Sequence, residues 1–88
     1  MTLKVLGSVD RYNSDLRRHY LMVFLQDEKG TKWNLYLDPK NRNWNRWEKL
    51  LIRGSWIKGL TPLPHGKNLI DADSPVESTQ DPKQPELF

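Results

Sequence analysis

The sequence contains no cysteine, which excludes disulfide bonds, thiolate metal ligands and a cysteine nucleophile. Only 36% of its 88 residues are hydrophobic, and no apolar run approaches the roughly 20 residues that a membrane-spanning helix needs. Residues 1–7 also lack the long apolar stretch of a secretory signal peptide. These absences favour a cytoplasmic location, and so short a chain has little material to support a catalytic pocket. We therefore expect a small, non-catalytic binding module.

Charge and proline are unevenly distributed along the chain. Residues 1–71 carry thirteen basic and seven acidic side chains, a net charge of +6, together with all five glycines. Residues 72–88 carry one lysine against four acidic side chains, a net charge of −3, together with three of the six prolines. A segment this polar buries too little apolar surface to offset the entropy lost on ordering it. We therefore predict a folded domain over residues 1–71 and a flexible acidic tail over residues 72–88.

Apolar patterning in the folded part predicts mainly β structure. In the first strand Leu3, Val5 and Val9 are expected to share one face, and Gly7 marks a bulge. A polar, basic loop is expected after this strand, over residues 11–18. The strands are predicted over residues 2–11, 20–26, 31–38, 51–60 and 67–71.

One short helix is predicted between the third and fourth strands. Trp44, Trp47 and Leu51 recur at spacings of three and four, which places them on one side of a helix and favours their burial. Asn41 or Asn43 can cap the N-terminus of this helix.

The order of three strands, a helix and two strands resembles the oligonucleotide/oligosaccharide-binding (OB) barrel, as does the glycine-broken fourth strand Arg53-Gly-Ser-Trp-Ile-Lys-Gly59. The resemblance implies a five-stranded OB-like barrel over residues 1–71, with ligands bound on the second and third strands and the adjoining loops. An SH3-like barrel is the competing architecture, but it usually has no helix at this place in the chain.

The turn between the second and third strands determines which of their side chains face inward. Glu28-Lys29-Gly30 is typical of a three-residue hairpin loop that ends with glycine in the left-handed conformation. This loop pairs Asp27 with Thr31, so the interior face is expected to carry Leu21, Val23, Leu25, Trp33, Leu35 and Leu37. The opposite face is then unusually aromatic for a surface in contact with water, since it carries Tyr20, Met22, Phe24, Gln26, Lys32, Asn34, Tyr36 and Asp38.

An exposed aromatic patch on a small domain usually marks an interface. Nucleic-acid bases stack on aromatic rings while basic side chains neutralise phosphates, and a net charge of +6 favours a polyanionic partner. The expected binding residues for single-stranded DNA or RNA are Tyr20, Phe24, Tyr36, Lys32, Asn34, Arg17, Arg18, Arg53 and Lys58. The alternative is a protein–protein adaptor or homodimer that uses the same face without nucleic acid.

No pattern in the sequence indicates a metal, a cofactor or catalysis. His19 and His65 are far apart, with no ligand spacing beside them. The segment from His65 to Lys67 lacks the second glycine and the trailing Ser/Thr of a phosphate-binding loop. Asp71 and Asp73 would need a pocket that nothing in the sequence predicts. We therefore expect no enzyme activity.

The final five residues, Gln84-Pro85-Glu86-Leu87-Phe88, resemble the peptide by which bacterial replication and repair proteins bind the sliding clamp, which has Gln, two variable residues and Leu-Phe. The resemblance implies that Gln84 hydrogen-bonds at the mouth of the clamp site and that Leu87 and Phe88 fill a hydrophobic pocket. Pro85 departs from the leucine common at the second position. Bacterial single-stranded-DNA-binding proteins, which join an OB domain to a tail ending in phenylalanine, are a second likeness, although this chain lacks their consecutive acidic residues.

Overall fold

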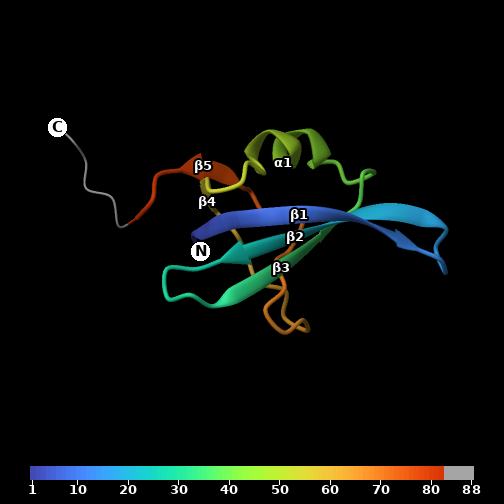
Figure 1. Ribbon diagram of the computed structural model, residues 1–88, viewed down its shortest axis with the longest axis horizontal. Coiled ribbons are helices and arrows are strands. Elements are labelled where there is room, and N and C mark those ends of the chain that lie inside the picture. Colours follow the sequence, from blue (N-terminus) through green and yellow to red (C-terminus); the bar gives the residue numbers. More distant parts are fainter. Residues whose placement is uncertain (83–88) are drawn as a thin grey trace.

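The computed structural model describes residues 1–82, which form five antiparallel strands in one sheet and one short helix. The strands lie side by side in the order β3-β2-β1-β4-β5, and α1 packs over one face of the sheet (Figure 1). The predicted mainly β class, the number of strands and the helix between the third and fourth of them are confirmed. No helix in the described part of the chain is long and apolar enough to cross a membrane. The elements are β1 (Leu3–Asn13), β2 (Arg18–Gln26), β3 (Lys32–Leu37), α1 (Trp44–Leu50), β4 (Trp56–Lys58) and β5 (Glu77–Thr79).

The β2–β3 hairpin has the predicted register. Gly30 has a φ of +89°, and its N–H donates to the carbonyl of Asp27 at 3.1 Å, while the Asp27 N–H donates to the carbonyl of Thr31 at 3.0 Å. Leu21 pairs with Leu37, Val23 with Leu35, and Leu25 with Trp33. The fully buried side chains among these are Val23, Leu25, Leu35 and Leu37, and the other two pack against the core.

Helix α1 closes the core from one side. Trp47 is fully buried, and Trp44 and Leu51 pack against the core, as their spacing predicts. Asn43 occupies the N-cap but makes no side-chain cap hydrogen bond. Asn41 supports the start of the helix instead, because its Oδ1 accepts the backbone N–H of Asn43 at 2.7 Å.

The alternation of β1 is interrupted at Leu6. Leu3 and Val5 point into the core and are buried, but the pairing of β1 with β2 shifts between Val5 and Gly7. Leu6 is therefore the extra residue of a β-bulge, and the side chains after it lie on the opposite faces. Val9 is 44% exposed as a result. The bulge beside Gly7 was expected, but the prediction that Val9 shares the face of Leu3 and Val5 is wrong.

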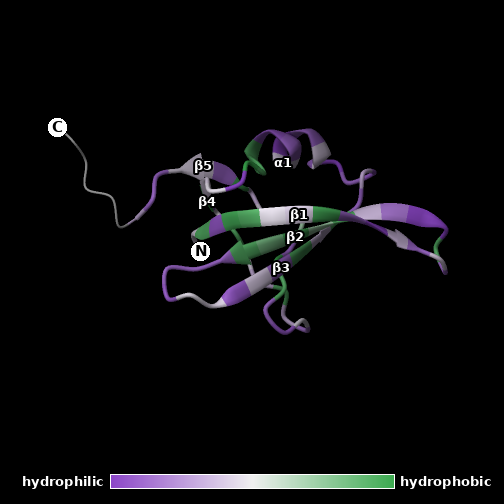
Figure 2. Cartoon of the chain, viewed as in Figure 1, coloured by the Kyte–Doolittle hydropathy of each residue, from purple (hydrophilic) through white to green (hydrophobic). Residues whose placement is uncertain are grey.

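β1 and β2 continue past the rest of the sheet as a two-stranded arm, defined here as residues 10–20. The basic loop predicted in this region is wrong, since the two strands pair throughout and are joined by residues 14–17 alone. Asn13 stabilises this turn, because its Oδ1 accepts the backbone N–H groups of Asp15 and Leu16 at 3.0 and 3.1 Å. Hydrophobic residues give way to hydrophilic ones where the arm leaves the sheet (Figure 2).

The described part of the predicted acidic tail belongs to the fold, so a domain boundary at residue 71 is too early. Val76 is fully buried in the core, and Glu77–Thr79 pairs with β4 as the last strand of the sheet. The fifth strand was predicted over residues 67–71, but this segment forms only isolated bridges. These bridges join Pro62 to Ile70 and Asn34 to Leu69, the second in parallel orientation.

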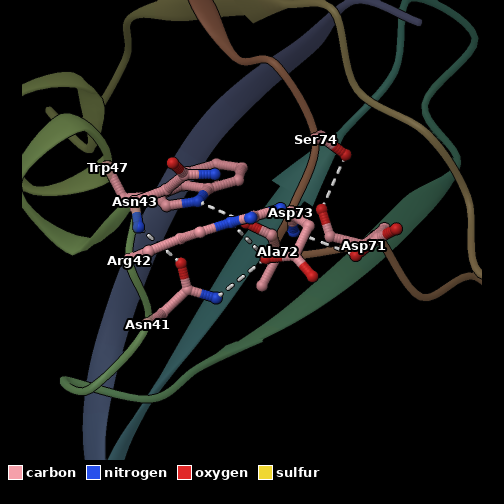
Figure 3. A network of polar contacts seen from close by, with 8 residues as sticks. All are labelled: Asn41, Arg42, Asn43, Trp47, Asp71, Ala72, Asp73 and Ser74. Atoms are coloured by element: carbon pink, nitrogen blue, oxygen red, sulfur yellow. Dashed lines mark hydrogen bonds and ion pairs between the residues drawn. The ribbon is translucent and has the colours of Figure 1, made fainter.

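Hydrogen bonds fasten the segment after β4 to the helix side of the core (Figure 3). The indole Nε1–H of Trp47 donates to the carbonyl of Ala72 at 2.8 Å. The hydroxyl of Ser74, which is buried, donates to the carbonyl of Asp71 at 2.6 Å and accepts the N–H of Thr61 at 3.0 Å. The mean composition of residues 72–88 gives no sign of this arrangement, because the buried Val76 and a few satisfied polar groups are enough to place residues 72–79 in the fold.

Asp27 organises the β2–β3 turn through both carboxylate oxygens. Oδ1 accepts the N–H groups of Lys29 and Thr31, each at 2.9 Å, and Oδ2 accepts the indole N–H of Trp33 at 3.3 Å. Desolvation alone would raise the pKa of Asp27. The hydrogen bonds from Thr31, Trp33 and Lys29 outweigh it and hold the pKa below its ordinary value of 3.8.

This depressed pKa predicts a pH-dependent contribution to stability. A carboxylate whose pKa is lower in the folded state stabilises the fold above its unfolded-state pKa, and the contribution is lost as the pH falls from about 3.8 through the lower folded-state value. We expect Asp27→Asn to lower the midpoint of urea unfolding at neutral pH, and the difference from the unmodified chain to shrink in strong acid. Glu28→Gln, at an exposed position of the same turn, is the control. A difference of constant size across this pH range would refute the assignment.

Candidate nucleic-acid interface

The outer face of the β2–β3 hairpin carries the predicted aromatic residues. The ring centroids of Tyr20 and Tyr36 lie 5.8 Å apart, with the ring planes tilted by 59°. Tyr36 is 48% exposed, while Tyr20 and Phe24 are half-buried. Phe24 lies farther along β2, opposite Asn34. The register set by the β2–β3 turn therefore places these rings on the face of the hairpin that points away from the central core.

The tyrosine pair is held in place by the side chains that alternate with it. Leu35 and Leu37 flank Tyr36 in sequence and are fully buried, while Leu21 packs against the core beside Tyr20. Because neighbouring residues of a strand point to opposite faces, these anchors orient both rings outward. The rings therefore need little further ordering before they contact a ligand.

The rings form part of the lining of an open concavity of about 470 Å³, which we call the tyrosine pocket. This volume lies in the range of about 300–1,000 Å³ that is usual for small-ligand sites. Leu16, which is 58% exposed, comes from the turn of the arm. The pocket thus combines apolar surfaces with both signs of charge. Its lining residues are Asn13, Leu16, Arg18, Tyr20, Tyr36 and Asp38.

An ion pair lies at the polar side of the tyrosine pocket. Arg18 Nη1 is 3.2 Å from Asp38 Oδ2, and the side chains are 45% and 33% exposed. Asp38 Oδ1 also accepts the backbone N–H of Lys40 at 2.9 Å. An ion pair this exposed contributes less than about 1 kcal/mol to stability, so the Arg18 guanidinium can exchange Asp38 for a phosphate or a base at little cost.

Three further predicted binding residues, from the turn of the arm and from β3, flank this pocket at different distances along the sheet. Arg17 lies in the turn of the arm with a φ of +51° and is exposed. Lys32 is exposed at the other end of the hairpin, opposite Gln26. Asn34 lies between them, and its backbone N–H and C=O bond to Asn68 and Ile70, each at 2.9 Å.

Two predicted binding residues lie away from the tyrosine pair. Arg53 follows α1 and lines a separate concavity beside the bulge in β1. Lys58 is on β4, where it pairs with Glu77 of β5. The structure therefore does not bring Arg53 or Lys58 together with Tyr20 and Tyr36.

Some lining residues were not among the predicted binding residues. Asn13, Leu16 and Asp38 line the tyrosine pocket, and Arg11 lies directly opposite Tyr20 on β1. The turn-forming preference of Asn13 is the signal that indicates a short hairpin in place of a long loop. The position of Leu16 had no comparable signal in the sequence.

The predicted clamp-binding residues Gln84, Leu87 and Phe88 lie outside the described residues. Within residues 1–82, no three His, Asp or Glu side chains gather where they could hold a metal ion.

Comparisons with known protein families, with curated proteins and with solved structures find no match. The geometry of the tyrosine pocket and the sequence patterns therefore carry the functional interpretation.

Proposed function

We propose that this protein is a non-catalytic, cytoplasmic module that binds single-stranded nucleic acid on the outer face of β2 and β3. The observation that carries the proposal is the partly exposed pair of Tyr20 and Tyr36 in an open concavity beside Arg18. Stacking on an aromatic ring contributes about 1–3 kcal/mol per base and tolerates any base. Arg17, exposed in the β1–β2 turn, and Lys32, exposed on β3, neutralise phosphates on either side of the pocket.

An OB-like architecture is part of this proposal. β1, β2 and β3 pair consecutively and β4 returns to pair with β1, while isolated bridges link residues 62 and 70 and residues 69 and 34. This circuit of contacts is consistent with a partly open five-stranded barrel, in which the second and third strands and the loop between the first two form the ligand-binding surface. The tyrosine pocket lies on that surface.

Titration with a fluorescein-labelled oligo-dT tests the proposal. We expect the intrinsic tyrosine and tryptophan fluorescence to be quenched and the affinity to fall as salt rises, because phosphate contacts release bound cations. With the two phosphate contacts of Arg17 and Lys32, raising the salt from about 50 to 200 mM lowers affinity roughly sevenfold for a single strand. Arg17→Gln should flatten this dependence, whereas Arg53→Gln, away from the pocket, is the matched control. A flat titration at low salt would rule out nucleic-acid binding.

The second candidate is an adaptor or homodimer that uses the same face. It is favoured by the exposure of Val9, Leu16 and Tyr36, which are 44%, 58% and 48% exposed. Sedimentation analysis separates the two candidates. A homodimer predicts self-association without oligonucleotide that Tyr36→Ala weakens, and an adaptor predicts a mass that oligonucleotide does not change. The nucleic-acid module predicts that the mass changes only when oligonucleotide is added.

We also propose that residues 84–88 recruit the protein to the bacterial sliding clamp or a related replication or repair partner. Joining a clamp contact to a nucleic-acid contact on one chain would raise the effective concentration of each for the other. We expect the double substitution Leu87→Ala/Phe88→Ala to abolish capture of the full chain on immobilised clamp, because both apolar contacts are removed. Glu86→Ala, at a variable position of the pattern, should be captured normally. Equal capture of all three chains would remove the clamp from the proposal.

A further inference from the structure

The Arg18–Asp38 pair places a carboxylate as well as a cation in the lining of the tyrosine pocket, and phosphate binding accounts only for the cation. A carboxylate repels phosphates, yet Asp38 lines the pocket beside the two rings that are proposed to stack bases. Asp38 is positioned there by the backbone N–H of Lys40, which Oδ1 accepts at 2.9 Å, while Oδ2 lies 3.2 Å from Arg18. A carboxylate positioned at a base-stacking site is suited to accept hydrogen bonds from the edge of a base.

We propose that the tyrosine pocket is selective for one guanine base. The inference rests on the proposed function and deepens it, because it names the base that the pocket selects. Guanine presents two adjacent N–H groups, at N1 and N2, beside the carbonyl O6 on its Watson–Crick edge. Asp38 accepts hydrogen bonds from the two N–H groups, and the neighbouring guanidinium of Arg18 donates to O6. Adenine, cytosine and thymine each lack the pair of adjacent N–H groups.

The apolar part of the pocket supplies the contacts to the base plane. Tyr20 and Tyr36, with ring centroids 5.8 Å apart, provide an aromatic surface for a single base. The side chain of Leu16 lines the same concavity from the turn of the arm, so a base stacked on the rings is covered on a second side. The volume of about 470 Å³ is ample for a purine. One base is therefore read at its edge while its neighbours along the strand are held by stacking and phosphate contacts.

The test compares labelled oligo-dT of twelve nucleotides with the same oligonucleotide carrying a single central dG, dA or dC. We expect the dG oligonucleotide to bind about fivefold or more tightly than the dA oligonucleotide, at the lower end of the discrimination that a bidentate base contact provides because the pocket is open. Asp38→Asn should erase the preference for dG, measured as the ratio of the dG and dA affinities within that variant. The asparagine Oδ1 can still accept the Lys40 N–H, so the turn is preserved, and Asp73→Asn is the matched control.

A second measurement uses the unmodified protein, so it does not depend on the folding of a variant. Titration with 5′-GMP should shift the NMR signals of the Tyr20 and Tyr36 rings at concentrations where 5′-AMP does not. Equal affinity for the dG and dA oligonucleotides, with oligo-dT binding intact, would overturn guanine selectivity and leave the proposed function standing. A dG preference that survives Asp38→Asn would also overturn it. Absence of binding to every oligonucleotide would instead overturn both proposals.

Discussion

Val76→Asp should unfold most of the domain under conditions in which the unmodified chain is folded. Val76 is fully buried in the core, although it lies within the segment that composition assigns to a flexible tail. An unpaired carboxylate at this position costs several kcal/mol, a large part of the total stability of about 5–15 kcal/mol that is usual for a domain. Urea unfolding followed by tryptophan fluorescence and far-UV circular dichroism measures the loss.

Val9→Asp is the matched control for this substitution. Val9 is 44% exposed, because the bulge at Leu6 turns it toward water, so a carboxylate there remains solvated. We expect a change within about 1 kcal/mol, which is usual for a surface position. Equal unfolding midpoints for the two variants would show that Val76 is not part of the core.

Replacing both Tyr20 and Tyr36 with alanine should weaken oligo-dT binding by about five- to 150-fold, which corresponds to the loss of one stacked base. Both residues point outward from strands whose inner side chains are buried, so the variant should stay folded. Fluorescence anisotropy with labelled oligo-dT gives the affinity, and circular dichroism checks the fold.

Tyr12→Ala is the control, because it shows how much oligo-dT binding falls when an exposed tyrosine outside the pocket is removed. Tyr12 is 57% exposed on the same arm, but it lies opposite His19, on the other face from the pair of Arg11 and Tyr20. Its ring packs against His19 with a centroid distance of 5.1 Å. If Tyr12→Ala weakened binding as much as the double substitution, the tyrosine pocket would not be the site.

The parts of the fold that local chemistry determines were predictable from the sequence. Gly30 defines a loop of fixed length, and that length determines every pair in the β2–β3 hairpin. The spacing of Trp44 and Trp47 indicates α1 because three to four residues make one helical turn. The bulge was harder, since Gly7 marks where alternation is interrupted but not that all later residues of β1 change faces.

The parts that depend on distant contacts were not predictable in the same way. Residues 74 and 76 are buried and bond to distant parts of the chain, since Ser74 accepts the N–H of Thr61 and the carbonyl of Val76 accepts the Nε–H of Arg46, and a polar local composition gives no sign of this. The tyrosine pocket likewise combines residues placed by local sequence with residues placed by distant contacts. Tyr20 and Tyr36 follow from hairpin register, whereas Asp38 meets Arg18 only because the arm brings the start of β2 beside the end of β3.

The arm extends beyond β3, so the two sides of the tyrosine pocket are supported to different extents. Tyr36 lies between the fully buried Leu35 and Leu37, but Leu16 lies in the turn of the arm, beyond the residues of β2 that pair with β3. The wall formed by Tyr36 is therefore anchored in the core. The wall formed by Leu16 is supported by the pairing of β1 with β2, by its own turn and by exposed side-chain contacts such as the Tyr12–His19 pair, and segments without core contacts open more readily. A ligand that contacts both walls must order the turn that carries Leu16, and the loss of chain entropy in this turn reduces the net binding free energy. Substitutions that stiffen the turn would then tighten binding without touching the ligand.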